Sequence, residues 1–487
     1  MKKLQLASLT LAALLLAGCG ASTASTAEST SEAVSTEETA PAAVFHLLGG
    51  EMRKATAETP LSPLWQDIYG FFDENSQWQK HLSLLKQGIG KTATPERLSP
   101  KTAKALYGKN IFSSVSRLER FAGCPFSFFA EYGLKAEERR LYQLNTPDLG
   151  SLFHEVLELF SNKLEQDSLS WTSLTKEETT ARMHAAVEDA APRLGNRILL
   201  DSAANQYLIR RLKRISTRAA WTLVQHLQQG DFVPAGYEVG FGAHEALPPI
   251  VIRLQDGGSL ILNGKIDRVD LLDANATRYV KIIDYKSGNK TFHFQDIYYG
   301  LQLQLLVYLD AYLKYYKKTG ASFKPGGVFY FRITDPTLAL DEELSAEAIE
   351  KILYEKMRMS GLLLQEDVLI HGLDHSLAES RSSAIVPVGY TKKGDPTAAS
   401  NLATEEQYAA ILDFVATRTQ EIGDATKAGI ITPAPYRDGQ RTPCSYCSYR
   451  SLCRHSYGEA PRWRKLKKID KADFWESITP KQPPETE

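Results

Sequence analysis

Two aspartates and a lysine occupy positions where neighbouring strands would bring them together. Asp267 ends one predicted strand, and Asp284 and Lys286 end the next, directly after the apolar pair 282–283. Because side chains alternate between the two faces of a strand, Asp284 and Lys286 lie on one face. If the strands pair, Asp267 joins them. An isolated Asp-x-Lys is more often a surface salt bridge, but the apolar pair indicates a carboxylate at the mouth of a buried strand.

Two carboxylates and an ammonium at one edge of a sheet predict metal-assisted hydrolysis of a phosphodiester. Carboxylate oxygens are hard ligands, and two of them leave most of the shell of Mg²⁺ open to water and phosphate. Such an ion polarises the phosphodiester and lowers the pKa of a bound water. The lysine would orient that water or offset the charge of the transition state.

Three further side chains are candidates for the same site. Gly150-x3-His154 places an imidazole on an apolar helix face, where a structural role and a role as a metal ligand are equally open. Gln304 and Tyr308 are one turn apart on a predicted helix and face the same side. The alternative for this pair is an amphipathic helix that happens to carry a glutamine.

Four cysteines could close a long stretch of chain around these residues. Cys124 stands alone, and the others follow as Cys444-x2-Cys447-x5-Cys453. The C-x2-C spacing brings two thiolates within reach of one metal centre. A distant fourth thiolate would make that centre a staple that ties folding of the enclosed segment to metal binding.

The combined motifs carry a family resemblance. Asp267…Asp284-x-Lys286 followed by Gln304-x3-Tyr308 resembles the PD-(D/E)XK nucleases, in particular their RecB-like branch. With Gly150-x3-His154 and the cysteine set, residues 111–470 look like the C-terminal nuclease domain of the AddB family. The resemblance implies a restriction-endonuclease-like α/β fold with a mixed sheet flanked by helices, helical insertions and a C-terminal iron–sulfur region.

The resemblance also implies roles for individual residues. Lys286 would be catalytic, with Gln304 and Tyr308 supporting the site and contacting DNA. A catalytic Mg²⁺ would be held by His154, Asp267, Asp284 and the carbonyl of Tyr285. A [4Fe–4S] cluster that pins the domain closed would be held by Cys124, Cys444, Cys447 and Cys453.

The activity that the resemblance implies is that of a metal-dependent deoxyribonuclease, an exonuclease of single-stranded DNA ends in double-strand break repair and recombination. The implied partner is an AddA-type helicase–nuclease subunit, since the chain carries no motor motif and we expect no unwinding by it alone. Two alternatives stay open. One is a non-catalytic module that binds DNA ends, and the other is a membrane-tethered lipoprotein whose cysteines hold a structural metal such as zinc.

The elements that must position these residues can be outlined from the sequence. Residues 114–165 read as two helices, with Ser114 or Ser116 capping the first, and residues 175–230 continue as long helices. Alternating apolar residues from 237 to 262 with Asp256-Gly257-Gly258 predict a strand and a hairpin. Strands over 264–270, 279–286 and 328–331 and a helix over 297–316 complete an α/β sandwich.

The N-terminal segment indicates a different cellular compartment from the one that the nuclease motif indicates. Residues 1–19 combine two lysines, an apolar run and Leu-Ala-Gly-Cys, which resembles a lipoprotein signal with Cys19 as the lipidated residue. A DNA-degrading iron–sulfur protein belongs in the reducing cytoplasm, with a membrane as partner only if the signal is genuine. A natural tethered form and a fragment joined to a foreign N-terminus by rearrangement or faulty gene calling both explain this. The second is favoured.

The remaining segments complete the expected organisation. Residues 20–44, rich in Ser, Thr, Ala and Glu, are expected to be a disordered tether, and 471–487 a flexible tail. Residues 45–110 are expected to be a helical remnant of the helicase-like region of the family. The chain of 487 residues has a net charge of −1, so DNA binding depends on local patches rather than on a global field.

Overall fold

The computed structural model describes residues 36–55, 59–89, 97–137, 146–193, 203–338, 344–453, 455 and 463–479. It divides into one compact unit of Met1–Thr94 with Arg454–Pro461 and a second of Pro95–Cys453 with Arg462–Glu487. The predicted signal segment with Cys19 lies outside the described residues. Among the helices that are described, none has both the length and the apolar composition needed to cross a membrane.

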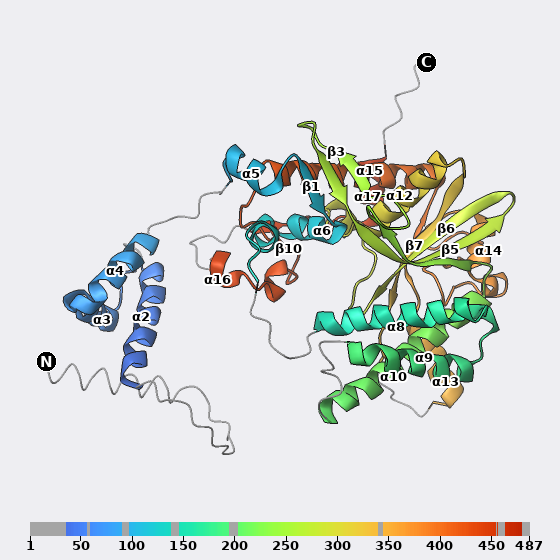
Figure 1. Ribbon diagram of the computed structural model, residues 1–487, viewed down its shortest axis with the longest axis horizontal. Helices are drawn as coiled ribbons and strands as arrows, with labels where there is room; N and C mark the ends of the chain where they lie inside the picture. Colours follow the sequence, from blue (N-terminus) through green and yellow to red (C-terminus); the bar gives the residue numbers. More distant parts are fainter. Residues whose placement is uncertain are drawn as a thin grey trace. The chain divides into compact units, whose positions relative to one another are not determined.

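The first unit contains the helices α2 (Thr36–Lys54), α3 (Pro63–Glu74) and α4 (Ser76–Ile89) (Figure 1). Leu48, Phe72 and Leu82 form its small apolar core, and the rings of Phe45 and Trp78 pack beside it with centroids 5.1 Å apart. Residues 36–44, expected within a disordered tether, are therefore helical. They begin a helix whose second half supplies Phe45 and Leu48 to this core.

The second unit is built on a mixed six-stranded sheet in the order β2-β5-β6-β7-β8-β9. The β2–β5, β5–β6 and β7–β8 pairs are antiparallel, and the β6–β7 and β8–β9 pairs are parallel. The strands are β2 (Val233–Phe241), β5 (Gly264–Ala274), β6 (Thr277–Lys286), β7 (Phe323–Arg332), β8 (Ser360–Leu364) and β9 (Leu402–Ala403). The mixed sheet flanked by helices, predicted from the sequence, is confirmed.

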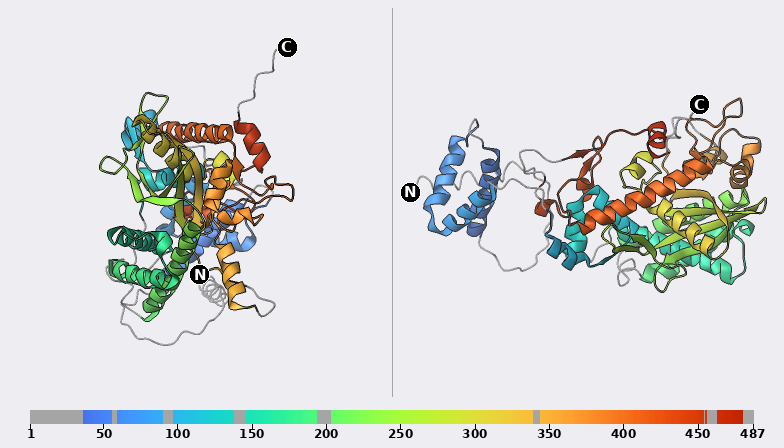
Figure 2. Two further views of the ribbon diagram at one scale, coloured as in Figure 1. Left: turned by 90° about the vertical axis from the view of Figure 1, so that its right-hand side faces the viewer. Right: turned by 90° about the horizontal axis from the view of Figure 1, so that it is seen from above.

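Helices cover both faces of this sheet (Figures 1 and 2). One side carries α8 (Thr146–Gln166), α9 (Lys176–Ala190) and α10 (Ala203–Gln228). The other carries α12 (Gln304–Lys318) and α15 (Glu405–Lys427). Because both faces are covered, the central strands β6 and β7 are buried over nearly their whole length.

Smaller elements surround this core. The predicted hairpin forms as β3 (Ile250–Arg253) and β4 (Ser259–Leu262), and β4 also pairs in parallel with β1 (Asn110–Ser113). A short parallel pair joins β10 (Tyr436–Arg437) to β11 (Arg464–Lys465). The short helices are α5 (Pro100–Tyr107), α6 (Val115–Gly123), α7 (Pro125–Phe128), α11 (Phe294–Tyr298), α13 (Ala346–Lys356), α14 (Asp367–Leu373), α16 (Arg450–Cys453) and α17 (Lys471–Ile478). Ser114 caps α6, as predicted, by accepting from the Arg117 N–H.

Two elements differ from their predicted form. The helix expected over 297–316 is broken into α11 and α12, because Gly300 adopts a left-handed backbone with φ of +74°. The tail expected to be flexible from residue 471 begins with α17 instead. Phe474 and Trp475 of that helix are buried, and both pack against Phe294 of α11.

The second unit also begins earlier than the nuclease domain predicted over 111–470. Contacts place its start at Pro95, so that α5 and the first residue of β1 belong to it. Ala103 of α5 is buried, and a side chain at Gly429 would press on it. The N-terminal helical segment expected over 45–110 thus contributes its last part to the sheet-containing unit.

Candidate active site

The two predicted metal-binding aspartates face each other across the pairing of β5 with β6. The antiparallel register has Arg268 opposite Ile283 as its last pair at this end of the sheet, and Asp267 and Asp284 are the next residues on the two strands. The two residues are 9% and 3% exposed, and the Tyr285 N–H donates to Asp267 Oδ2 over 2.6 Å. Asp267 lies near the beginning of β5 rather than at its end, because the strands are antiparallel and the start of β5 meets the end of β6.

Asp284 is held by side chains at both of its oxygens. Gln304 Nε2 donates to Oδ1 over 2.7 Å, and the Lys286 ammonium forms an ion pair with Oδ2. Burial and then the charge of Asp267 raise the pKa of Asp284 to about 6, although Lys286 opposes them. A bound divalent cation would favour the ionised form of both aspartates, so their closeness suits a cation.

Glu238 of β2 forms, with His154 and Asp267, a ligand group that the sequence did not reveal. One ligand atom each of His154, Glu238 and Asp267 lies within 4.8 Å of the others. His154 Nδ1 is 3.4 Å from Asp267 Oδ2. Burial, followed by the charges of Asp267 and Glu158, raises the pKa of Glu238 to about 7. Oxygen and imidazole ligands from α8, β2 and β5 therefore converge where a divalent cation would sit.

No sequence signal marks Glu238, because the alternation along its strand identifies only the apolar face. Tyr237, Val239 and Phe241 mark the apolar face that the pattern detects, and Glu238 falls on the other face of β2. Its backbone φ is +46°, which is uncommon for a residue with a Cβ atom, and a register shift between Pro234 and Gly236 precedes it. Irregular backbone of this kind re-aims a side chain in a way that periodicity cannot predict.

His154 reaches the aspartates because α8 passes close to the end of β6. Gly150 lies one helical turn before His154, and a Cβ atom at Gly150 would be 3.2 Å from Ser287 Oγ. A larger residue at 150 would press on the side chain of Ser287, which directly follows Lys286. Burial disfavours a charged imidazole, but the hydrogen bond with Asp267 and the charges of Asp267 and Asp284 together outweigh it, so the pKa of His154 is raised.

The two predicted tyrosines take different positions. Tyr308 is buried on α12, its ring packs against Phe241 at 5.6 Å between centroids, and its hydroxyl fills the space that a side chain at Gly264 would need. It thereby supports the start of β5, just before Asp267. The Tyr285 side chain points to the opposite face from Asp284, and its ring is 6.1 Å from that of His154. Metal binding by its carbonyl and DNA contact by Tyr308 stay predictions.

Glu119 of α6 is a second residue that sequence reasoning missed. Its Oε1 accepts from the N–H groups of Leu303 and Gln304 over 2.8 and 3.0 Å, and its Oε2 is 3.2 Å from Lys290 Nζ. It therefore caps α12, whose own N-cap side chain makes no such bond. The sequence separation of 184 between Glu119 and Leu303 leaves no local pattern by which the contact could be recognised.

The four cysteines are free thiols that two distant segments bring together. Cys124 is buried at the start of α7, and burial, followed by the charge of Cys444, raises the pKa of its thiol. Burial, followed by the charges of Cys447 and Cys453, likewise raises the pKa of the Cys444 thiol. Cys447 Sγ is 4.0 Å from Oγ of Ser127, which lies three residues after Cys124.

The four side chains are a set of sulfur donors, two of them in a C-x2-C segment. Structural zinc sites and iron–sulfur clusters both use such a set. Binding of a [4Fe–4S] cluster therefore stays a prediction.

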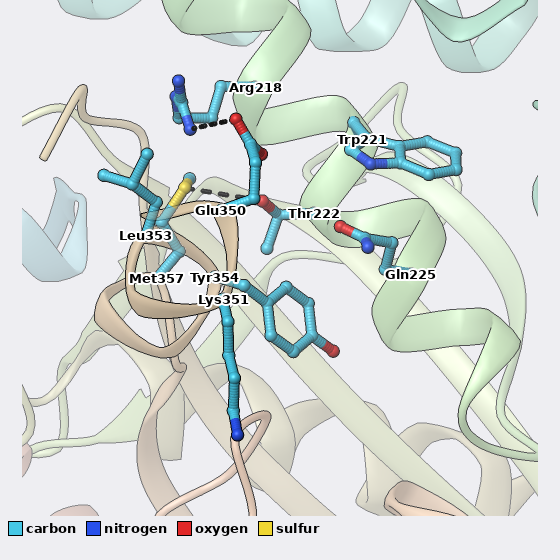
Figure 3. Close-up of a pocket in the computed structure, with 9 residues that line it drawn as sticks. All are labelled: Arg218, Trp221, Thr222, Gln225, Glu350, Lys351, Leu353, Tyr354 and Met357. Atoms are coloured by element: carbon cyan, nitrogen blue, oxygen red, sulfur yellow. Dashed lines mark hydrogen bonds and ion pairs between the residues drawn. The ribbon is translucent and has the colours of Figure 1, made fainter. Parts of the chain in front are cut away.

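A cavity of about 180 Å³ lies apart from these two sites, between α10 and α13 (Figure 3). Arg218 and Glu350 face each other across it at 3.9 Å, and Trp221 and Tyr354 form part of its wall. Arg218 also lies 3.3 Å from Asp335. The cavity shares no lining residue with the acidic site.

A mixed sheet that presents two aspartates and a lysine at neighbouring strand ends, with an imidazole from a helix that covers the sheet, defines a class of nuclease. The chain belongs to this class, the PD-(D/E)XK nuclease superfamily, whose family model matches residues 113–454. A second model, for the fifth domain of the ATP-dependent helicase/deoxyribonuclease AddB, matches residues 38–88. The predicted resemblance to AddB is thereby confirmed.

Curated relatives carry the same description over most of the chain. The B subunit of the ATP-dependent helicase/deoxyribonuclease of Alkaliphilus oremlandii is 39% identical over 443 residues, 90% of this chain and 38% of the relative. That of Alkaliphilus metalliredigens is 40% identical over 417 residues, 85% of this chain and 36% of the relative. A Thermoanaerobacter relative is 35% identical over 86% of this chain. The chain thus spans little more than a third of the length of these relatives.

Proposed function

We propose that this chain is a metal-dependent deoxyribonuclease that hydrolyses phosphodiester bonds at single-stranded DNA ends. The observation that carries the proposal is the closeness of Asp267 and Asp284 at the adjoining ends of β5 and β6, with Lys286 on one acid and His154 on the other. A surface salt bridge would not need a buried second carboxylate or an imidazole. The superfamily match supports the same reaction class.

The cation would be held by His154, Asp267 and Asp284, with Glu238 as a further ligand and the Tyr285 carbonyl as the remaining protein contact. When bound, Mg²⁺ would polarise the phosphodiester and supply a water of lowered pKa. The chain's own groups do the positioning. Gln304 fixes Asp284 through Oδ1, and the Tyr285 N–H fixes Asp267 through Oδ2.

Lys286 supplies a positive charge beside the phosphate, where the reaction needs it. Its ammonium is held at Asp284, and its pKa stays raised because the charges of Asp284 and Asp267 outweigh the effect of burial. It is therefore protonated at neutral pH. A fixed ammonium stabilises negative charge that develops on the phosphoryl oxygens as the bond to the leaving oxygen breaks.

We further propose the context of the reaction from the family match. The curated relatives are named as the B subunit of an ATP-dependent helicase/deoxyribonuclease, so an AddA-type helicase–nuclease subunit is the proposed partner, in repair and recombination of broken DNA. Cys124, Cys444, Cys447 and Cys453 would hold a [4Fe–4S] cluster that keeps the domain closed. Because its substrate would be DNA and such a cluster needs a reducing environment, the proposed location of the protein is the cytoplasm.

The decisive experiment is cleavage of end-labelled single-stranded DNA by the purified chain with Mg²⁺. We expect cleavage that Asp284→Ala abolishes, and Lys286→Ala should lower turnover about 100- to 1,000-fold while DNA affinity stays nearly unchanged, because its role is in the transition state. DNA binding without cleavage by the unaltered protein would instead support a non-catalytic end-binding module. Equal losses of affinity and rate in Lys286→Ala would make the lysine a phosphate anchor.

A further inference from the structure

The segment that carries Gln304 is tied at two points to the cysteine-bearing parts of the chain. This segment, residues 294–304, contains α11, the turn at Gly300 and the first residue of α12. It follows Lys286 in the chain, and its last residue donates to Asp284 over 2.7 Å. The position of the segment therefore sets the orientation of a proposed metal ligand.

The first tie comes from the Cys124 side. Glu119 is on α6, which ends at Gly123 immediately before Cys124, and its side chain is only 12% exposed. One carboxylate oxygen accepts from both Leu303 and Gln304, the two N–H groups at the start of α12. Such N–H groups have no partner within their own helix, so Glu119 supplies the acceptor that fixes where α12 begins. Charge-assisted bonds of this kind are stronger than neutral ones.

The second tie comes from the Cys444 side. Arg441 lies three residues before Cys444 and forms a bidentate pair with Asp296 of α11, over 2.8 and 2.6 Å. Asp296 is 6% exposed, so the pair is shielded from solvent on one partner. Gln295 adds a bond of 3.0 Å to Asp438, from the same loop as Arg441. A bidentate fork fixes orientation as well as distance.

We propose that Glu119 and Arg441 are positioning residues that transmit closure of the cysteine segments to Gln304 and through it to Asp284. The inference rests on the proposed nuclease function. Because the two ties enter the 294–304 segment from opposite ends of the cysteine set, the segment is fully held only when both cysteine segments are in place. Loss of the metal centre would then release Gln304 and misorient Asp284, although no cysteine touches either residue.

The test uses the full chain with its metal centre, purified without oxygen, and the variants Glu119→Ala and Arg441→Ala. We expect iron content and DNA affinity near those of the unaltered protein. Turnover on single-stranded DNA should fall about 10- to 100-fold, because misplacing a reacting group costs rate more than binding. Amide hydrogen exchange over 294–310 should speed up in both variants, which gives a readout that does not depend on activity.

Matched variants separate positioning from general damage. Glu119→Gln keeps a carbonyl oxygen for both N–H groups and should restore slow exchange and most of the turnover. Arg278→Ala removes another bidentate Arg–Asp pair, with Asp273 at 2.6 and 2.8 Å in the β5–β6 turn, and should leave exchange over 294–310 unchanged. If Glu119→Ala does not fold, Arg441→Lys, which keeps the charge without the fork, gives the same comparison.

Removal of the metal centre from the unaltered protein completes the test. We expect exchange over 294–310 to rise there as it does in the two alanine variants. Unchanged exchange in that segment after both substitutions would overturn the inference. So would an exchange rate that, in the two alanine variants, rises equally over the whole sheet-containing unit. If the unaltered protein fails to cleave DNA, the proposed function fails, while the exchange measurements still decide whether the two ties position the segment.

Discussion

Glu238 and Asp267 place two carboxylates beside one imidazole in a largely buried setting. The nearby Lys265 ammonium lies 3.9 Å from Glu238, too far for a strong ion pair, and burial raises the pKa of Glu238 to about 7. Two carboxylates held this closely repel each other unless a cation lies between them. The strained φ of Glu238 fits a side chain that is kept in place by its role rather than by its backbone preference.

We therefore expect Glu238→Gln to weaken binding of Mn²⁺, used as a spectroscopic substitute for Mg²⁺, by at least about tenfold. The amide keeps the shape of the side chain and removes its charge. Electron paramagnetic resonance titration at pH 8 measures the affinity without any nuclease assay. Glu158→Gln is the control, since Glu158 acts on Glu238 through its charge but is not among the three converging ligands. Equal affinities for Glu238→Gln and the unaltered protein would remove Glu238 from the site.

At the scale of the element, the break between α11 and α12 decides where Gln304 points. Gly300 has φ of +74°, and a Cβ atom there would lie 3.1 Å from Ile422 Cδ1 and 3.4 Å from Ala122 Cβ. The turn is therefore both left-handed and closely packed between α15 and α6. A continuous helix over 297–316 would leave no such turn, and Glu119 could not cap α12 at Leu303 and Gln304.

Gly300→Ala should lower the free energy of unfolding by about 1–2 kcal/mol, since an alanine is strained at positive φ and also presses on its neighbours. Urea denaturation measures this change. Gly320→Ala is the matched control, because Gly320 has φ of +89° but a Cβ atom added there would meet no described atom within 4 Å, so it reports backbone strain alone. A Gly300→Ala variant no less stable than Gly320→Ala would show that packing at the turn is not tight.

The features that could be predicted from the sequence are those that follow a regular side-chain period. The features that were missed depend on no such period. The alternation of side chains along strands predicted that Asp284 and Lys286 share a face, and the apolar stretches predicted β2 to β7 in order. Along β2, the same alternation identifies the apolar face only, and Glu238 lies on the other face, for which the pattern predicts no role. The Gly300 break and the burial of Phe474 depend on contacts between distant segments. Local sequence cannot reveal such contacts.

At the scale of the whole molecule, the core encloses a group of charges. Arg268 forms a bidentate pair with Asp270 over 2.6 and 3.0 Å, and Lys281 lies 2.9 Å from the same aspartate. His226 of α10 is buried nearby against Phe331 and Tyr354, and neither ring nitrogen has a hydrogen-bond partner among the described residues. Burial, and then the charges of Lys281 and Arg268, lower the pKa of His226 to about 3.

His226 should therefore make the protein less stable in acid. The folded protein keeps the ring neutral down to about pH 3, whereas the unfolded chain takes up a proton near pH 6.5. The unfolded state binds more protons between these values, so stability present above pH 6.5 is lost as the pH falls. From pH 7.5 to 5 this amounts to about 2 kcal/mol. Urea unfolding at both pH values should show this loss of stability in the unaltered protein and not in His226→Leu. Parallel curves would contradict it.

The proposed cluster would act on the whole sheet-containing unit, because Cys124 and Cys453 enclose most of its described strands and helices. Closing so long a loop costs conformational entropy that binding of the metal centre would offset. Cys447→Ser removes one ligand and should make the unit from 124 to 453 more sensitive to limited proteolysis, with loss of the iron–sulfur absorbance. Tyr446→Ala, at a neighbouring residue that is 96% exposed, is the control and should change neither. If Cys447→Ser loses the absorbance but resists protease as well as the control does, the centre does not hold the fold closed. The two ties through Glu119 and Arg441 would then have to act without it.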